Sequence, residues 1–311
     1  MLSYALRRVA FLVPALLGIT LATFAILQVT PGDPVRIALG VGATPQRIAE
    51  VRRTLWLNQP ILVQYWHYLW GLLHGSLGTS IVGGIPIREQ IFQRLPSTLQ
   101  LAGAGLVLAV IFGVGAGAIA GITHRRSLDG GLMVITLSGL SLPVFWVGII
   151  GIYVFAVHLG WVSAFAGTGL RNLILPAVVV ALAPGATLAM VTRAATLDVI
   201  HEDHVRTARS KGLSPLRVST VHVLRNALIP VVTVLGLIMS DLITGAVFVE
   251  VIFSRSGLGS YAVTAVEQRD FPQVQGVVLF VAVVYVLVNL GTDLVYGALD
   301  PRVRAGSRPP L

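Results

Sequence analysis

Six long apolar stretches dominate this chain of 311 residues. A bilayer core of roughly 30 Å needs about 20 helical residues at 1.5 Å each, and all six stretches are near or above that length. Hydrophobic residues make up 55% of the sequence and charged residues 11%, and the mean hydropathy is +0.84. These values exclude an ordinary soluble domain. We therefore predict an all-α integral membrane protein with six transmembrane helices, at residues 9–29, 99–122, 132–157, 173–191, 228–253 and 274–296.

The distribution of basic residues predicts the orientation of the six helices. An even number of spans places both termini on one side of the membrane. With the termini inside, more than half of the 22 basic residues are cytoplasmic, whereas the short outer loops contain only Arg171, Arg255 and Arg269. This asymmetry predicts a multi-pass protein with both termini in the cytoplasm. The cytoplasmic set is Arg7, Arg8, Arg125, Arg126, Arg193, Arg206, Arg209, Lys211, Arg217, Arg225, Arg302, Arg304 and Arg308.

The spans divide the chain into segments. Residues 1–29 form a cytoplasmic N-terminus and a first transmembrane helix, which is too long for a cleaved signal peptide. Residues 30–97 form an extracytoplasmic helical segment. Residues 98–300 form a transmembrane core of five helices with a cytoplasmic loop at 198–227, and residues 301–311 form a cytoplasmic tail.

The outer segment carries turn and helix signals. The turn Pro31-Gly32-Asp33-Pro34 ends the first span, and Thr44-Pro45 begins an amphipathic helix with Ile48, Val51 and Leu55 on one face. Aromatic residues follow close together, and such clusters beside a span are typical of the headgroup level. We expect a helix lying on the outer leaflet, and an aromatic ligand-binding box stays the alternative. The aromatic residues are Trp56, Tyr65, Trp66, Tyr68 and Trp70.

Small residues and prolines predict how the spans pack and bend. In the second span Gly113, Gly117 and Gly121 recur every four residues, which gives a smooth face for a neighbouring helix. Pro143 in the third span and Pro176 and Pro184 in the fourth are expected to bend or locally open their helices.

The polar stretch from Ile200 to Pro230 is predicted to form two short helices joined by a turn. Gly212 suits a helix C-terminus at positive φ, and Leu213 can fold back on the preceding helix. Ser214 offers an N-cap oxygen and Pro215 a preset first helical φ. We call this stretch, residues 200–230, the elbow, and expect it to be rigid, basic and exposed to water, so that it offers a partner a stiff contact.

Several chemistries are excluded or disfavoured by the residues present. The chain has no cysteine, which excludes disulfides and thiolate chemistry. Its single lysine, Lys211, precedes Gly212, so no phosphate-binding loop of the Gly-Lys-Ser/Thr type exists. His201 and His204 beside two carboxylates could bind a metal, but a solvated charged turn is favoured. Nucleic-acid binding is disfavoured because the arginines are separated by apolar runs. No catalytic set is evident, and we predict no enzyme activity and no cofactor in this chain.

Polar residues within the spans are candidates for a translocation pathway. Asp241 lies near the middle of the fifth span, and Glu250 lies toward its outer end. A carboxylate at mid-membrane is costly unless it faces a cavity or a partner. One hypothesis has Asp241 lining the pathway, together with Ser141, Asn289 and Asp293. An interhelical hydrogen bond or a subunit contact explains Asp241 equally well.

The elbow resembles the EAA loop of permease subunits of binding-protein-dependent ABC importers, with Arg206-Thr207-Ala208 in place of Glu-Ala-Ala and Gly212 at the expected spacing. The flanks of this motif, including Leu224 to Pro230, are similar to the dipeptide, oligopeptide, nickel and glutathione subgroup, and the resemblance to its first permease subunit covers essentially the whole chain. Further matching stretches are Pro31 to Pro34, Arg94 to Thr98, Phe253 to Gly259, Val288 to Leu290 and Leu299 to Arg302. Ser256 and Ser76 depart from the residues that relatives often carry there.

The resemblance implies an ABC type I importer permease fold and a set of partners. These are a second homologous permease subunit, two cytoplasmic ABC ATPases that bind ATP and Mg²⁺, and an extracytoplasmic solute-binding protein, in a bacterial or archaeal cytoplasmic membrane. It also implies that the elbow docks into a groove on an ATPase. The coupling candidates are Arg206, Thr207, Ala208, Gly212, Leu213 and Ser214.

The resemblance further implies peptides as cargo, with nickel chelates, glutathione and sugars as alternatives. A secondary transporter or channel and a membrane-embedded enzyme that uses Asp241 are the competing functions. The first would show paired broken helices in inverted repeats, and we find no internal repeat in the sequence.

Overall fold

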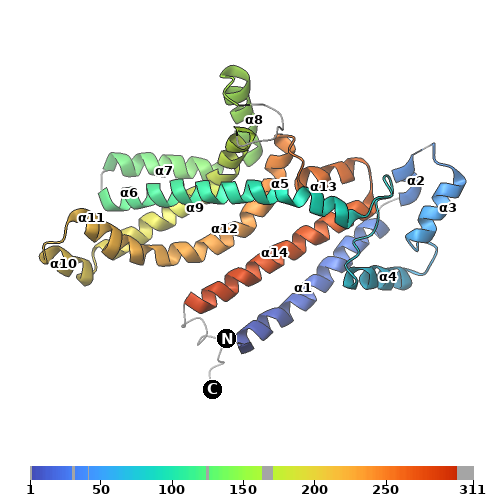
Figure 1. Cartoon of the computed structure of the whole chain (residues 1–311), viewed down its shortest axis with the longest axis horizontal. Helices are drawn as coiled ribbons and strands as arrows, with labels where there is room; N and C mark the ends of the chain where they lie inside the picture. Colours follow the sequence, from blue (N-terminus) through green and yellow to red (C-terminus); the bar gives the residue numbers. More distant parts are fainter. Residues whose placement is uncertain (1, 30–31, 41, 124–125, 163–170, 300–311) are drawn as a thin grey trace. The chain divides into compact units, whose positions relative to one another are not determined.

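A computed structural model describes residues 2–29, 32–40, 42–123, 126–162 and 171–299 (Figure 1). These residues form α-helices, short π-helical turns (η) and connections, and a single isolated bridge joins Thr79 to Pro86. The predicted all-helical fold is confirmed over this range. The elements are α1 Leu2–Val29, α2 Pro34–Leu39, α3 Pro45–Thr54, α4 Ile61–Leu73, α5 Ile87–Leu108, η1 Ala109–Val114, α6 Gly115–Thr123, α7 Arg126–Ser141, α8 Val144–Gly151, η2 Ile152–His158, α9 Arg171–Ile200, α10 Asp203–Ser210, α11 Pro215–Arg217, η3 Val218–Leu224, α12 Arg225–Ile252, α13 Leu258–Glu267 and α14 Phe271–Leu299.

Four helical runs among the described residues are long and apolar enough to cross a membrane. They are Ile87–Thr123, Arg171–Ile200, Pro215–Ile252 and Phe271–Thr292, and they coincide with the second, fourth, fifth and sixth predicted spans. The third predicted span is a helix pair, Gly130–Ser141 and Val144–His158, with a 106° bend between its parts. The first predicted span lies in α1, a helix of 28 residues whose apolar part within the described range is Leu12–Ala25. The count of six spans stays a prediction.

The prolines act differently in the two helices where a bend was expected. Pro143 has φ −61° and ψ 133°, so the chain leaves the helix there and restarts as α8, as predicted. Pro176 and Pro184 lie inside α9, which remains one helix through both of them. The local opening expected in α9 is therefore wrong. Pro176 has no N–H to bond the carbonyl oxygen of Asn172 one turn earlier, and Nη1 of Arg255 donates to that oxygen at 3.3 Å instead.

Contacts group the chain into two compact units, residues 1–97 with 256–311 and residues 98–255. The second unit is built around α9, which packs against η1, α6, α7 and α12. Its core is almost wholly aliphatic. Fully or nearly fully buried members are Leu101, Ala109, Leu188, Val231, Leu242 and Val249.

Glycines allow the close approach of η1 and α6 to α9. A Cβ atom on Gly113 would lie 2.5 Å from the carbonyl oxygen of Gly185, and one on Gly121 would lie 2.6 Å from Cβ of Thr196. A Cβ atom on Gly117 would collide with the carbonyl oxygen of Ala189. The prediction that these three glycines form a helix contact is confirmed, because any side chain there would push the helices apart.

The first unit joins segments that are distant in sequence. The helices α1 and α14 pack side by side, and Gln275 Nε2 on α14 donates a hydrogen bond of 2.8 Å to the carbonyl oxygen of Thr23 on α1. A second apolar cluster joins Ile87 and Ile91 of α5 to Tyr261 of α13 and Val277 of α14.

The helix α3 begins where the sequence indicates, at Thr44-Pro45, whereas α2, which begins at Pro34, was not predicted. Asp33 caps α2 by accepting a hydrogen bond from the Val35 amide, and Thr44 caps α3 by accepting one from the Arg47 amide. The apolar face of α3 packs through Val51 against Val35 and Ile81. Pro31 and the predicted tail at 301–311 lie outside the described residues.

Candidate functional site

The elbow has the predicted helix, turn and helix arrangement. α10 ends at Ser210, and Gly212 adopts φ +77°, a conformation that side chains rarely allow. The amide of Leu213 donates to the carbonyl oxygen of Ala208 at 3.4 Å, so the chain folds back on the helix that it has just left. Pro215 begins α11 as expected, but the side chain of Ser214 makes no capping hydrogen bond. The prediction of a Ser214 side-chain cap is wrong, because the fixed φ of Pro215 and the backbone conformation suffice to start the next helix.

The elbow is stiffened by a buried apolar underside. Val205 and Ala208 of α10 pack against Val218 and Val223 of η3, and Leu213 closes over the same cluster. The other buried members are Ala195, Val199, Ile200 and Ala227, which connect the elbow to the ends of α9 and α12. Both arms of the elbow are therefore held to the long helices by apolar burial.

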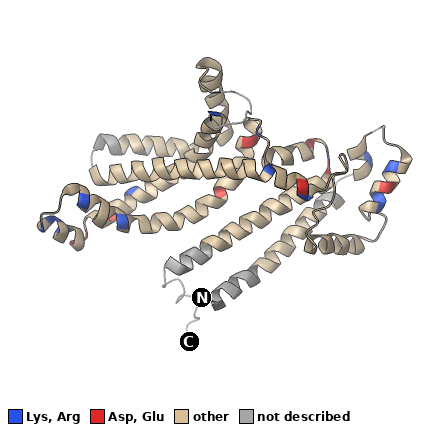
Figure 2. Ribbon diagram, viewed as in Figure 1, with Lys and Arg blue, Asp and Glu red and all other residues tan. Residues whose placement is uncertain are grey.

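The face of the elbow opposite its apolar underside is exposed to solvent, and the elbow carries several basic side chains (Figure 2). Arg206, Thr207, Gly212 and Ser214 are exposed, and Leu213 is half-buried. Ala208 is buried, so among the six coupling candidates it supports the turn from below instead of facing a partner. The structure brings all six together within one surface feature.

A polar link also joins α10 to the start of α12. His204 Nδ1 lies 3.0 Å from Glu202 Oε2, and His204 Nε2 lies 3.1 Å from both the carbonyl oxygen of His222 and Nδ2 of Asn226. His201 Nδ1 instead lies 3.0 Å from the carbonyl oxygen of Leu197. The two histidines thus contact different partners, and this arrangement favours a structural role over a shared metal.

The pathway candidates lie on three different helices. Asp241 is exposed on α12, Ser141 is exposed at the end of α7, and Asn289 is half-buried on α14. The side chain of Asp293 lies outside the described residues. Glu250, which is also on α12, is fully buried and belongs to the interior of its unit.

Sequence reasoning missed a buried polar centre in the first unit. Asp270 is fully buried, and its Oδ2 accepts hydrogen bonds from Ser80 Oγ at 2.5 Å and from the Val82 amide at 3.2 Å. Its Oδ1 accepts from the Gln273 amide at 3.3 Å, which caps α14. An aspartate directly before Phe271-Pro272 could have been recognised as an N-cap. Nothing in the sequence points to Ser80 as its partner.

An aromatic contact lies in the same unit. The guanidinium of Arg94 lies 4.4 Å from the ring centroid of Tyr261. Burial raises the pKa of Tyr261 to about 12, and the charge of Asp270 acts in the same direction while that of Arg94 opposes it. The phenol is therefore neutral at physiological pH, and the pair acts as a cation–π contact.

Comparisons with known proteins agree along the whole chain. Residues 113–305 match the family of binding-protein-dependent transport system inner membrane components, and residues 1–102 match its N-terminal family. The chain is 40% identical to the di/tripeptide transport system permease protein DppB of Pseudomonas aeruginosa over 333 residues, covering 98% of this chain and 99% of that protein. It is also 40% identical to the glutathione transport system permease protein GsiC of Escherichia coli K12 over 304 residues, with the same coverage.

A solved structure shares the fold. An amino acid ABC transporter crystallised with histidines superposes with a TM-score of 0.52 at 16% identity, covering 69% of this chain and 94% of that one. The family matches and the long, highly covered relatives lead to one conclusion: the chain belongs to the binding-protein-dependent transport system inner membrane components, the permease subunits of ABC importers.

Proposed function

We propose that this chain is the permease subunit of an ATP-driven importer of di- or oligopeptides. It forms the translocation pathway with a second, homologous permease, receives cargo from an extracytoplasmic solute-binding protein, and is driven by two ATPases that carry ATP and Mg²⁺. Six spans place both termini in the cytoplasm and residues 30–97 outside. The resemblance of the elbow to the EAA loop and the names of the similar permeases support this function.

The construction of the elbow is the observation that carries the proposal. A segment that transmits motion must be stiff within itself and firmly joined to the helices that it moves. The apolar underside joins α10 and η3 to α9 and α12, whereas Arg206, Thr207 and Ser214 face outward. We assign these three exposed side chains to contact with an ATPase, and Ala208, Gly212 and Leu213 to the shape of the turn.

Closure of the ATPases would then move the elbow as a rigid body. Such a motion can switch the spans between two packings, one open to each side of the membrane. Asp241 is exposed on α12, which continues directly from η3, so a displacement of the elbow is passed to the helix that carries this carboxylate. We place Asp241 in the pathway, with Ser141, Asn289 and Asp293 as further candidates.

A glycine substitution tests the role of the elbow. A Cβ atom added at Gly212 would meet nothing within 4 Å, so a side chain there encounters only the strain of φ +77°. Gly212→Val should abolish ATP-dependent uptake of a labelled dipeptide while the chain still inserts and assembles. Gly212→Asn is the matched control, because asparagine tolerates this conformation, and it should retain most of the uptake. Normal uptake by Gly212→Val would remove the elbow from the mechanism.

A second experiment tests the pathway residue. Asp241→Asn and Asp241→Ala should both reduce uptake without reducing the amount of assembled transporter. If both variants transport at the normal rate, Asp241 has an interhelical or subunit role instead.

Glutathione is the second cargo that a specific observation favours, because the similar GsiC is a glutathione permease. No comparable observation favours nickel chelates or sugars as cargo. Thermal shift of the cognate solute-binding protein with dipeptides, oligopeptides and glutathione separates these classes. Stabilisation by glutathione alone would replace the peptide assignment.

A further inference from the structure

The helix α4 is tied along one face to the outer half of α1. The hydroxyl of Tyr65 lies 3.0 Å from Thr20 Oγ1, and that of Tyr68 lies 3.2 Å from Thr23 Oγ1. The ring of Phe24 fits against both tyrosines, with centroid distances of 5.2 and 5.9 Å. Two polar contacts and one aromatic cluster therefore fix α4 at a definite height on α1.

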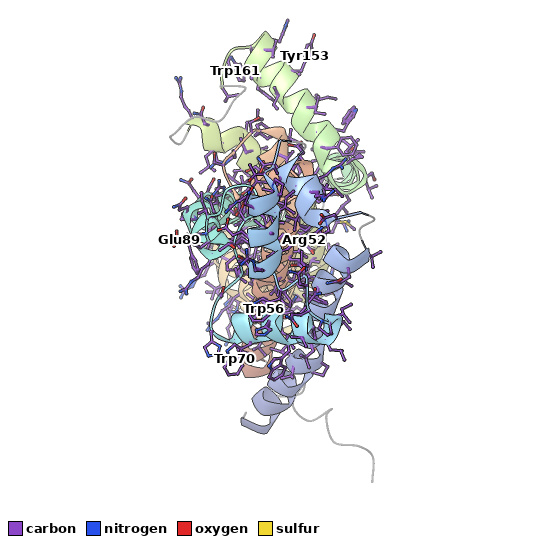
Figure 3. The ribbon with its side chains drawn as sticks, turned by 90° about the vertical axis from the view of Figure 1, so that its right-hand side faces the viewer. Arg52, Trp56, Trp70, Glu89, Tyr153 and Trp161 are labelled. Carbon is purple, nitrogen blue, oxygen red and sulfur yellow. The ribbon has the colours of Figure 1, made fainter. Side chains whose placement is uncertain are left out.

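A different face of α4 is apolar and uncovered in this chain. Leu62, Trp66, Trp70 and Leu73 follow one another at spacings of four, four and three residues, which places them on one side of the helix. Their exposed fractions are 79, 62, 54 and 79%. Trp70 is labelled on this helix in Figure 3. These two tryptophans and two leucines form a contiguous apolar strip, whose exposure to water is energetically unfavourable.

The third face of α4 is polar. Gln64 accepts a hydrogen bond of 2.8 Å from Gln28 near the end of α1, and its own amide donates to the carbonyl oxygen of Gln59. The ring of His67 stacks on Trp56 at 3.7 Å. A helix with a polar side and an apolar side that carries tryptophan and leucine has the pattern of a helix that lies in a membrane interface.

The contacts with α1 indicate how deep α4 lies relative to the end of α1. At about 1.5 Å per residue, Thr23 and Thr20 lie about 9 and 14 Å along the helix from its end at Val29, and a tilted helix brings both nearer the surface. Interfacial helices bury their apolar faces by about 5–10 Å. The surface of α1 around the contact is itself apolar and exposed at Leu17 and Leu21, so the strip on α4 continues a surface of the kind that lipid covers.

We infer that α4 is an in-plane anchor, embedded in the leaflet at the C-terminal end of α1, with Leu62, Trp66, Trp70 and Leu73 against lipid acyl chains and headgroups. This inference rests on the proposed function insofar as α1 must be a membrane span. It makes the segment after α1 a part of the membrane boundary, from which α2 and α3 project. A second protein that covers the strip is the competing occupant, and the test must separate the two.

The absence of cysteine from the sequence allows a direct test with single spin labels. Leu62→Cys and Leu73→Cys place labels on the strip, Glu50→Cys places one on exposed α3, and Leu21→Cys reports on α1. Each variant is purified as the assembled transporter, reconstituted in phospholipid vesicles, and labelled with a nitroxide. Collision rates with oxygen, which enters lipid, are compared with those of a water-soluble nickel chelate.

We expect oxygen collisions to exceed nickel collisions several-fold at Leu62 and Leu73, with the reverse at Glu50. Nickel access at Leu62 and Leu73 would overturn the inference, and so would exclusion of both reagents, which would show a covering protein. Nickel access at Leu21 would instead show that α1 is no span and would overturn the proposed topology. ATP-dependent uptake of a labelled dipeptide by vesicles that contain the unlabelled wild-type transporter tests the function separately. No uptake there, together with lipid-like accessibility at Leu62 and Leu73, would contradict the function and leave the anchor intact.

Discussion

The two units of this chain are stabilised in contrasting ways. In residues 98–255, neighbouring helices meet through glycine and aliphatic side chains, and the elbow is held by contacts between residues close in sequence. In the unit of residues 1–97 and 256–311, distant segments are tied by buried polar groups, such as Ser80 to Asp270 and Thr23 to Gln275. In the unit of residues 98–255, the helices pack closely through apolar contacts that have little directional preference. In the other unit, directional hydrogen bonds specify which distant segments meet.

Removal of the central polar group should have the largest effect. Asp270→Ala leaves the donors of Ser80, Val82 and Gln273 without their acceptor in a buried site. We expect a loss of about 4 kcal/mol in the free energy of unfolding, because each buried unsatisfied group costs about 1–3 kcal/mol. Thermal unfolding of the purified protein in detergent measures it. The exposed carboxylate Glu267 provides the control, and Glu267→Ala should change stability by less than about 0.5 kcal/mol. Equal losses of stability in the two variants would show that the buried hydrogen bonds of Asp270 do not stabilise this unit.

A pair of alanine substitutions tests the close packing of the other unit. Gly117→Ala places a methyl group against the carbonyl of Ala189 and 2.8 Å from Cβ of Thr192, and overpacking of this kind costs about 1–3 kcal/mol. Gly115→Ala, on the same helix, meets nothing within 4 Å and should be neutral or stabilising by up to about 1 kcal/mol. The thermal unfolding midpoints of the two variants, compared with that of the wild type, measure these effects. Stabilisation by both would show that the helices are not in close contact at Gly117.

The elbow should respond to loss of its underside more than to loss of an exposed side chain. Val205 is fully buried, and Val205→Ala should cost about 2 kcal/mol through the cavity that it leaves. Leu216 is 75% exposed, so Leu216→Ala should leave stability unchanged within about 0.5 kcal/mol although it removes more atoms. Hydrogen exchange of the amides in α10 measures the local effect. Faster exchange only in Leu216→Ala would show that the elbow is stabilised from its outer side.

The smallest effect is expected at the cap of α2. Asp33 Oδ2 lies 2.5 Å from Nη2 of Arg52 and 3.4 Å from Nε of Arg36. Desolvation by burial raises the pKa of Asp33, but the hydrogen bond and charge of Arg52 and the backbone donors outweigh it and bring the pKa below its ordinary value of 3.8. The stabilisation is therefore present at neutral pH and is lost as the pH falls through the folded-state pKa.

Two variants separate the cap from the charge. Asp33→Ala should cost about 1 kcal/mol at pH 7, and Asp33→Asn, which keeps a capping oxygen, should cost less. The difference between wild type and Asp33→Ala should shrink in acid unfolding experiments as the carboxylate is protonated. A difference that is constant down to pH 2 would show that the ion pairs with Arg52 and Arg36 contribute nothing.

Short-range sequence patterns predicted most of the features that depend on neighbouring residues. The apolar runs located four long spans and the broken third one, Gly212 indicated the turn of the elbow, and Thr44-Pro45 indicated the start of α3. Two predictions were wrong, one for a local reason and the other for a tertiary one. The side chain of Ser214 makes no cap because Pro215 already starts the helix. α9 remains one helix through Pro176 and Pro184, and Arg255 donates to the Asn172 carbonyl oxygen that Pro176 leaves free.

The sequence by itself determined the membrane character, the helical class and the shape of the elbow, because apolar run length, helix capping and positive φ depend on residues a few positions apart. Only the tertiary structure decided which distant residues meet. Ser80 and Asp270 are separated by 190 positions, and Thr23 and Gln275 by 252. A hydrogen bond of about 3 Å depends on where the packed helices bring two atoms, and one sequence contains no signal for that meeting.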